Sequence, residues 1–585
     1  MDFASDFTRP TEAIHASICN GDLARLRGLI ASDQALVHSQ SGRGTPLEVA
    51  VKCANVEAVR ILLDAGAVPL SQEDSGRVHE SAMGMAASDG HRDMSQLFRE
   101  WLTSQSCLHR DQYQRLVELC LYEAATHGHG AIVFDYLNWT SFAWSERSPE
   151  RAWMAAISRW EADVVDMLHP MVLKDQATIE KALCRALALK TILPEEERRG
   201  IIDYKPVDQL QQYRIVLCLL FAGGDANGLC NGDSGKPLLH MAISGTILQG
   251  GLHALLDGGA NPEIQDRRGR TALHFLTWPI SVDGQGFRTA FHEAGIRLLV
   301  AKGAKVTTGD AEGETPLHWA AMHGAFEVFQ LYLSSCADRD AALASQNAHG
   351  ETLLHYAAAG AQCRTIEFLL ESGLDINATS QSGWTPLLCA LTPASAGGRY
   401  KRKTQADAVQ AALLLLSRGA LPTTVTAEGW MALHCIGSYP DLDAPADAAI
   451  LVGELVALDG MPALVNSCAR GFDRLWLPRI SKEARRDLYG EEPWGFRVGK
   501  TLAQCAATET AVVKEGLTPL HWAAERGAVG VTKVLLEAGA DPELRDSTGS
   551  TPRKLAAKSE LLMKMRHKDK DEIQRKMREL LKEEE

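Results

Sequence analysis

The stretch Gly516–Gly527 (GLTPLHWAAERG), followed by Val534–Asp541 (VLLEAGAD), decides the fold of this chain. Thr518 is placed to cap a helix with its hydroxyl, and Pro519 suits the first helical position, where no backbone N–H is needed. Gly527 can take the left-handed conformation that ends a helix. The stretch predicts two short helices joined by a turn. Such a unit cannot bury its apolar face alone, so copies of it must stack.

Copies of this stretch occur elsewhere in the chain. Thr315–Ala321 (TPLHWAA), Thr352–Ala358 (TLLHYAA) and Thr385–Leu387 (TPL) repeat its opening, and Thr385 follows Thr352 by 33 residues. In this motif and this period the chain resembles the ankyrin-repeat family. The resemblance implies an all-α solenoid of about 12–14 helix–turn–helix units with β-turn loops between them. It also implies that the function depends on a bound partner.

Composition limits the functional classes. The 585 residues are 45% hydrophobic and 23% charged, which is ordinary for a globular protein. The net charge of −14 argues against a broad nucleic-acid-binding surface, which needs clustered Lys and Arg. The 13 cysteines are scattered without a C-x-x-C pair, so we expect reduced core thiols in a reducing compartment.

The N-terminal residues carry no secretory signal. Met1–Asp6 is acidic and lacks an apolar core, and no run approaches the ~18 apolar residues that span a bilayer. We therefore expect a monomeric protein in the cytoplasm, with the nucleus as an alternative location.

Spacing divides the chain into four segments. Residues 1–210 contain degenerate ankyrin-like repeats, and residues 211–465 contain regular repeats with loop insertions. Residues 466–515 form an aromatic-rich insertion, which either packs back on the solenoid or hides one degenerate repeat. Residues 516–585 contain the last ankyrin repeat and a capping repeat, whose amphipathic helix we expect at Asp571–Leu581.

Two short motifs suggest enzymes but lack the context that catalysis needs. Gly499–Thr501 (GKT) resembles the end of a phosphate-binding loop, but Trp494 stands where that loop needs glycine. Gly232–Gly235 (GDSG) resembles a serine-protease segment, yet Gly, Asp and Ser are ordinary turn residues. With no acid–base pair singled out, we expect no enzyme, no catalytic residue and no cofactor.

A histidine recurs at the fourth position of the motif. Because stacked repeats separate these side chains, we expect no metal site from them. The resemblance implies instead that they form hydrogen bonds within and between repeats. They are His240, His274, His318, His355, His434 and His521.

Large aromatic residues recur at two positions of the motif, one directly after that histidine and one directly before the position of the threonine. In ankyrin repeats the first position is variable and faces the concave groove. We therefore expect these side chains to bind a protein partner there, because aromatic residues bury much area at little entropic cost. The alternative is ordinary packing under insertions or neighbouring helices. The residues are Phe275, Trp319, Tyr356, Trp384, Trp430 and Trp522.

Two further segments suggest regulation. Leu369–Asn377 resembles the context in which ankyrin asparagines are hydroxylated, which makes Asn377 the candidate. Gly398–Lys403 is a short basic run, which is either a nuclear-import signal, a contact for an acidic partner or a solvated loop.

Together these features predict a non-catalytic scaffold or adaptor that binds a protein partner in the concave ankyrin groove. One alternative is an enzyme whose site lies in the irregular N-terminal repeats or in the 466–515 insertion. Another is an adaptor for a ligase or a transport complex that relies on the repeats alone.

Overall fold

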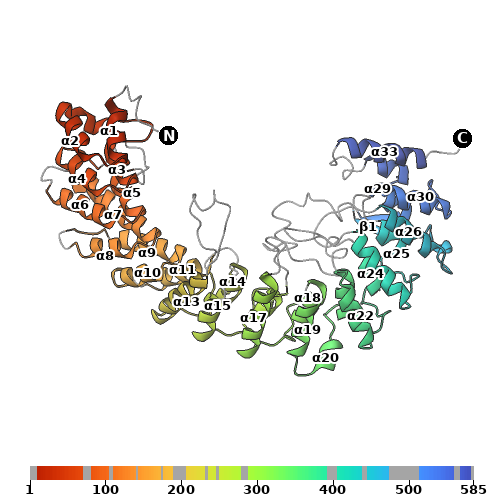
Figure 1. The fold of residues 1–585 in the computed structure, drawn as a ribbon. Coiled ribbons are helices and arrows are strands. Elements are labelled where there is room, and N and C mark those ends of the chain that lie inside the picture. The colour runs from red at the N-terminus through yellow and green to blue at the C-terminus, as the bar shows by residue number, and fades with distance from the viewer. Residues whose placement is uncertain are drawn as a thin grey trace. The chain divides into compact units, whose positions relative to one another are not determined.

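In the residues that the computed structural model describes, short helices predominate (Figure 1). Its contacts divide the chain into two units, residues 1–261 and residues 262–585, which are described separately below. The structure describes residues 10–69, 81–104, 110–139, 142–145, 147–172, 175–188, 206–230, 235–245, 250–277, 287–323, 325–391, 405–437, 445–472, 513–558 and 567–581.

The described part of the first unit contains seven successive helix pairs. The first helices of successive pairs pack on one another, and so do the second helices, as in a helical solenoid. The pairs are α1 (Pro10–Cys19) with α2 (Leu23–Ser32), α3 (Pro46–Lys52) with α4 (Val56–Asp64), α5 (Ala82–Ser88) with α6 (Arg92–Ser104), α7 (Arg110–Thr126) with α8 (Gly130–Leu137), α9 (Ser148–Arg159) with α10 (Ala162–Leu168), α11 (Gln176–Leu187) with α13 (Pro206–Phe221), and α14 (Leu238–Gly245) with α15 (Gly250–Asp257).

Local signals explain these early helices even where the repeat motif is degenerate. The side chain of Asp22 caps α2 by accepting a hydrogen bond from the Arg25 amide at 3.0 Å. Thr45 and Glu48 form a reciprocal capping box at the start of α3. Caps of this kind fix where a helix begins, so the structure continues as helix pairs where the motif is weak.

The described part of the second unit contains seven more helix pairs. They pack in the same first-on-first and second-on-second manner along most of the unit. The pairs are α16 (Ala272–Phe275) with α17 (Phe287–Ala301), α18 (Pro316–His323) with α19 (Phe326–Ser334), α21 (Leu353–Ala359) with α22 (Cys363–Glu371), α23 (Pro386–Leu391) with α24 (Gln405–Ser417), α25 (Ala432–Gly437) with α26 (Pro445–Val456), α29 (Pro519–Arg526) with α30 (Val529–Glu537), and α31 (Pro552–Lys558) with α33 (His567–Leu580).

The stretch at 516–541 folds as its sequence predicts. The Thr518 hydroxyl accepts a hydrogen bond from the His521 amide at 3.4 Å, and Pro519 is the first residue of α29. Gly527 ends the helix in the left-handed conformation, with φ of 72°. Leu520 and Ala523 are fully buried, as a stacked unit requires.

Strands β1 (Ala469–Phe472) and β2 (Val513–Leu517) flank the long insertion and pair in antiparallel fashion. Helices α25 and α26 pack directly on α29 and α30, which follow the insertion in sequence. The helix pairs on either side of the insertion are therefore direct neighbours in the stack. Residues 473–512, which include Gly499–Thr501, lie outside the described residues.

The last helix, α33, begins at His567, four residues before the predicted start. It packs on α30 and α31, and Met577 in the helix and Leu581 directly after it are buried. A charged helix with one apolar stripe covers the end of a stack in this way.

The cysteines differ from the expectation of buried thiols. All those in the described residues are free, but Cys19, Cys53 and Cys468 are exposed. Burial raises the pKa of the Cys120 thiol to about 12, so that thiol stays protonated and inert. Among the described helices, none has the length and apolarity needed to cross a bilayer.

Candidate partner-binding surface

Four turns of the second unit share one construction. An Asp or Asn accepts hydrogen bonds from the backbone amides two and four residues later, at 2.8–3.0 Å. Short polar side chains commonly close turns in this way. The four residues are Asp266, Asp310, Asn347 and Asp546. The turns at 380–384 and 426–430 use the hydroxyls of Ser380 and Thr426 instead.

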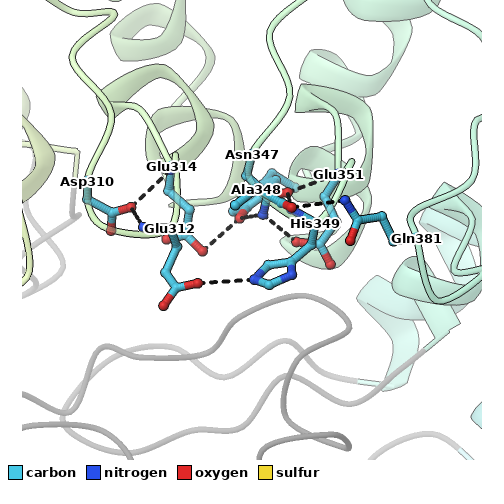
Figure 2. Close-up of polar contacts among 9 residues, drawn as sticks. Asp310, Glu312, Glu314, Asn347, Ala348, His349, Glu351 and Gln381 are labelled. Carbon is cyan, nitrogen blue, oxygen red and sulfur yellow. Dashed lines mark hydrogen bonds and ion pairs between the residues drawn. The ribbon is translucent and has the colours of Figure 1, made fainter.

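Successive turns are joined by a ladder of backbone hydrogen bonds, part of which Figure 2 shows. In each rung an amide at one turn or strand donates to a carbonyl at the turn or strand before it, over 2.8–2.9 Å, with Arg470 in β1 and Glu515 in β2. The rungs are Ala311 to Arg268, Ala348 to Glu312, Gln381 to His349, Ala427 to Ser382, Arg470 to Glu428, and Ser547 to Glu515. We call residues 266–270, 310–314, 347–351, 380–384 and 426–430 the tip row.

The tip row presents small and polar groups to solvent. The residue after each capping side chain is exposed, and the next one is half-buried. Between neighbouring tips, a carboxylate oxygen of Glu312 lies 3.1 Å from Nε2 of His349 (Figure 2). The exposed residues are Arg267, Ala311, Ala348, Gln381 and Ala427.

Below the tips, Glu314 is a buried carboxylate held by two aromatic residues. Trp319 donates from Nε1 to one Glu314 oxygen at 2.9 Å, and the Tyr356 hydroxyl donates to the other at 2.8 Å. Burial, and then the charge of Glu314, raise the pKa of Tyr356 well above its ordinary value. The phenol therefore stays neutral and serves as a donor to the carboxylate.

Asn347 extends this network to the next turn. Its side-chain nitrogen donates to the Tyr356 hydroxyl at 2.9 Å and to the Glu351 carboxylate at 2.7 Å. Glu351 and Glu314 occupy equivalent positions directly before the repeat threonine. The tips at 310–314 and 347–351 are thus joined both by backbone and by buried side chains.

Arg270 occupies the same position one repeat earlier. Its guanidinium lies 2.6 Å from the Asp266 carboxylate and 4.7 Å from the centre of the Phe275 ring. Burial disfavours the charge on Asp266, but the Arg270 charge and the hydrogen bonds outweigh this effect and lower the pKa of Asp266. The pair therefore stays ionised beside the aromatic rings.

Three tryptophans continue the arrangement toward the last repeats. The ring centroids of Trp384 and Trp430 are 6.4 Å apart, and those of Trp430 and Trp522 are 5.0 Å apart. Trp430 also donates from Nε1 to the Arg470 carbonyl in β1 at 2.9 Å. These contacts join the turn before α25 to the strand that follows α26.

The structure thus places all six predicted aromatic residues close to neighbouring repeats, but it does not leave them open. Each is between 1% and 8% exposed. The expectation of an open aromatic groove is corrected in this respect, because the rings hydrogen-bond and stack within the fold. Whether a partner reaches them stays a prediction. The six are Phe275, Trp319, Tyr356, Trp384, Trp430 and Trp522.

Three of the buried histidines form the hydrogen bonds within and between repeats that the resemblance implied. Nδ1 of His355 pairs with the Thr352 hydroxyl at 2.9 Å, and Nε2 lies 3.0 Å from the Trp384 carbonyl of the next turn. His274 and His521 make equivalent pairs of contacts. Burial lowers the pKa of His355 to about 4, so its ring is neutral at pH 7.

Asn377 forms a similar link on the second helices' side of the repeat. Its side-chain oxygen accepts from the Leu421 amide at 2.9 Å, and its nitrogen donates to the Gly419 carbonyl at 3.5 Å. The side chain is half-buried. Hydroxylation there stays a prediction.

The structure also describes a cleft of about 420 Å³ against the helices α17, α19 and α22. Glu293, Arg297, Glu327 and Arg339 contribute charges, and Phe368 contributes an apolar wall. This cleft could not be predicted from the sequence, because its residues share no motif.

Other predicted segments lie outside the described residues. They are the basic run at 398–403 and most of Gly232–Gly235.

The sequence analysis did not predict that Arg270, Glu314 and Glu351 support the tip row. The available signal was position, since each stands directly before a repeat threonine, as Trp384 does, and Trp430 stands at the same position before Met431. The aromatic pattern alone does not indicate Glu314, the carboxylate that accepts hydrogen bonds from Trp319 and Tyr356.

The stacked helix pairs and the ladder of turns define a helical repeat protein. Residues 289–380 match a family model described as ankyrin repeats in three copies, and residues 513–556 match one described as ankyrin repeats in many copies. Ankyrin repeats are therefore present in these two segments of the chain.

Two curated relatives are similar to a larger part of the chain than either family model covers. A mouse protein (Mus musculus) named palmitoyltransferase ZDHHC13 is 24% identical over 263 residues, which are 45% of this chain and 31% of that protein. A Danio rerio protein with the same ZDHHC13 designation is 24% identical over 319 residues, 53% of this chain and 37% of that protein. The chain spans about a third of the length of these relatives.

The relatives' names correct one prediction. We expected no enzyme, whereas these similar proteins are named as palmitoyltransferases. The repeat motif could not indicate this, because the same fold serves many functions.

Proposed function

We propose that this chain is an interaction module that binds a protein partner, and that the tip row makes the contact. The observation that carries the proposal is the backbone ladder, which holds successive tips in one register. A surface that is already ordered loses little conformational entropy on binding. Ankyrin repeats, which are protein-interaction repeats, give the proposal independent support.

The buried network gives the tips their rigidity. Trp319, Tyr356 and Glu314 hold the turns from below, while exposed groups such as Ala348 and Gln381 stay accessible. In this proposal the aromatic residues support the binding surface, and direct contact with the partner is an additional role for them.

The test uses exposed alanines of the tip row. In the full chain, Ala311→Arg with Ala348→Arg adds bulk and charge without removing a ladder bond, because the ladder uses backbone groups. Affinity capture from native extract, with quantitative mass spectrometry, should lose a partner that the unchanged chain retains. Ala344→Arg, at an exposed position outside the tip row, is the matched control and should retain it.

If the Ala311→Arg, Ala348→Arg double variant captures the same proteins as the unchanged chain, the proposal that the tip row contacts the partner is wrong. The Trp319→Ala, Tyr356→Ala double variant is less informative alone, because both side chains are buried and its effect includes loss of stability.

A second candidate function is palmitoyl transfer, favoured by the names of the two relatives. Incubation of the full chain with labelled palmitoyl-CoA and detergent-solubilised cell protein tests it. An acyltransferase should increase thioester-linked label in protein above the level with heat-denatured chain. Equal incorporation with the two samples would remove this candidate.

A further inference from the structure

Two exposed cysteines of the first two helix pairs lie in contact. Cys19 is the last residue of α1, and Cys53 directly follows α3. Their sulfur atoms are 3.1 Å apart. Because the cysteines are 34 positions apart, about one repeat, the stacking of α1 on α3 brings them side by side.

The backbone around the pair is fixed by contacts that do not involve sulfur. The side chain of Asn55 donates to the Ile18 carbonyl at 3.2 Å, which joins the turn after α3 to the end of α1. The same side chain caps α4 by accepting from the Ala58 amide at 3.0 Å. The fold therefore holds the two thiols together whether or not they are bonded.

A disulfide needs sulfur atoms about 2.05 Å apart, so these sulfurs must approach by about 1 Å. Rotation of two exposed side chains on a fixed backbone can supply a movement of that size. We propose that Cys19 and Cys53 form a redox-responsive modification site, which glutathione disulfide converts into an intrachain disulfide joining the first helix pair to the second. This role is separate from partner binding at the tip row.

The reaction is a double thiol–disulfide exchange. The thiolate of one cysteine attacks a sulfur of glutathione disulfide, whose S–S bond breaks and releases one glutathione thiolate. The second protein thiolate then attacks the protein sulfur of the mixed disulfide and releases the other glutathione. The two protein thiols lose two electrons and two protons, and one glutathione disulfide becomes two glutathione molecules.

The surroundings of Cys53 make thiol–disulfide exchange at this site slow. Burial, and then the hydrogen bond with Cys19, raise the pKa of the Cys53 thiol to about 11, while the charge of Arg43 opposes this rise. Few Cys53 thiolates exist at pH 7, and the thiolate is the reacting form. The site therefore responds to a sustained oxidising environment.

The test measures which cysteines pair in the full chain. The protein is equilibrated in glutathione buffers of increasing oxidation, quenched with acid, alkylated and mapped by mass spectrometry. We expect at least about tenfold more Cys19–Cys53 disulfide than any other cysteine pair, reversed by dithiothreitol. Recovery of these two residues only as free thiols or as separate glutathione adducts, at every ratio, would overturn the proposal.

Variants separate pairing from simple reactivity. In the Cys19→Ser variant, Cys53 should form a mixed disulfide with glutathione instead of an intrachain disulfide. Cys468→Ser, at the third exposed cysteine among those described, should leave the Cys19–Cys53 disulfide unchanged. A disulfide between Cys53 and another cysteine in the unchanged chain would also overturn the assignment.

The bond should have a local physical effect. Hydrogen exchange in residues 10–64 should slow by about tenfold or more in the oxidised chain, because a covalent link between α1 and α3 disfavours local opening. Exchange in residues 519–537 serves as the internal reference. Equal exchange in oxidised and reduced chain would contradict the proposed join.

Discussion

At the scale of the single residue, glycine decides whether the ladder can form. Gly269 has φ of 77°, and a Cβ atom there would lie 2.8 Å from the Ala311 amide nitrogen that makes a rung. Gly549 has nearly the same conformation, with φ of 72°, but a Cβ atom there would meet nothing within 4 Å. The two positions separate backbone strain from steric exclusion.

We predict that Gly269→Ala destabilises its turn more than Gly549→Ala. Both substitutions should lower stability by about 1–2 kcal/mol, because alanine is strained in the left-handed conformation. Gly269→Ala should lower it by about 1–3 kcal/mol more, because the new methyl group crowds the Ala311 amide. Hydrogen exchange by mass spectrometry, read at residues 305–316 and 545–557, measures the two losses. Equal losses would mean that the rung tolerates a methyl group.

The Tyr356 hydroxyl gives a second prediction at this scale. Tyr356→Phe removes a hydrogen-bond donor to the buried Glu314 carboxylate. The substitution should lower the free energy of unfolding by about 1.5–3 kcal/mol. The matched control is Tyr332→Phe, since Tyr332 is equally buried but donates to the neutral Leu273 carbonyl and should cost about 0.5–1.5 kcal/mol. A larger loss in the control, read by local hydrogen exchange, would contradict the importance of the carboxylate.

Residue roles were predictable where chemistry is local. Thr518, Pro519 and Gly527 could be assigned from sequence because capping depends on a few neighbouring atoms. The pairing of Glu314 with Tyr356 could not, because it joins residues 42 positions apart. Burial of the aromatic rings likewise depends on neighbouring repeats.

At the scale of the element, the hairpin of β1 and β2 shows how the solenoid accepts a long insertion. Phe472 pairs with Val513, so the chain leaves and returns at one point. The sequence placed the insertion at 466–515, but it could not show that strands flank it. Strand pairing between segments about 40 residues apart leaves no short-range signal.

We predict that residues 473–512 can be replaced by Asn-Gly without loss of the stack. A two-residue turn of this type closes an antiparallel pair, and α25 and α26 already contact α29 and α30. Hydrogen exchange in residues 432–456 and 519–537 should stay within about threefold of the unchanged chain. Rapid exchange in both segments would show that the insertion holds these pairs together.

At the scale of the whole molecule, buried neutral histidines should make the second unit acid-sensitive. Burial lowers the pKa of His318 to about 3 and that of His434 to about 4, as it does for His355. The unfolded chain binds these protons near pH 6.5, so it gains protons first as the pH falls. Stability is therefore full above about pH 6.5 and declines as the pH falls toward 4.

We predict that each of these histidines lowers the free energy of unfolding by about 2 kcal/mol when the pH falls from 7 to 5. His355→Gln is the matched variant, because glutamine can keep the capping box with Thr352 but does not titrate. Local stability of residues 353–371, from hydrogen exchange corrected for intrinsic pH dependence, should decline by about 2 kcal/mol less in the variant. Equal declines would assign the acid sensitivity to other groups.

The general fold was predictable because repetition makes each motif copy evidence for the others. The irregular first unit followed less directly, since its helices keep caps and turns while the motif fades. The relatives' enzymatic name was not predictable from repeats, because the same fold serves many functions.

The ladder has a consequence for evolution. Each rung joins peptide groups, which every amino acid except proline can supply on the donor side. Mutations at Ala311, Ala348 or Gln381 can therefore accumulate by drift while the register of the turns persists. Such an edge can change its specificity over generations without first losing its architecture.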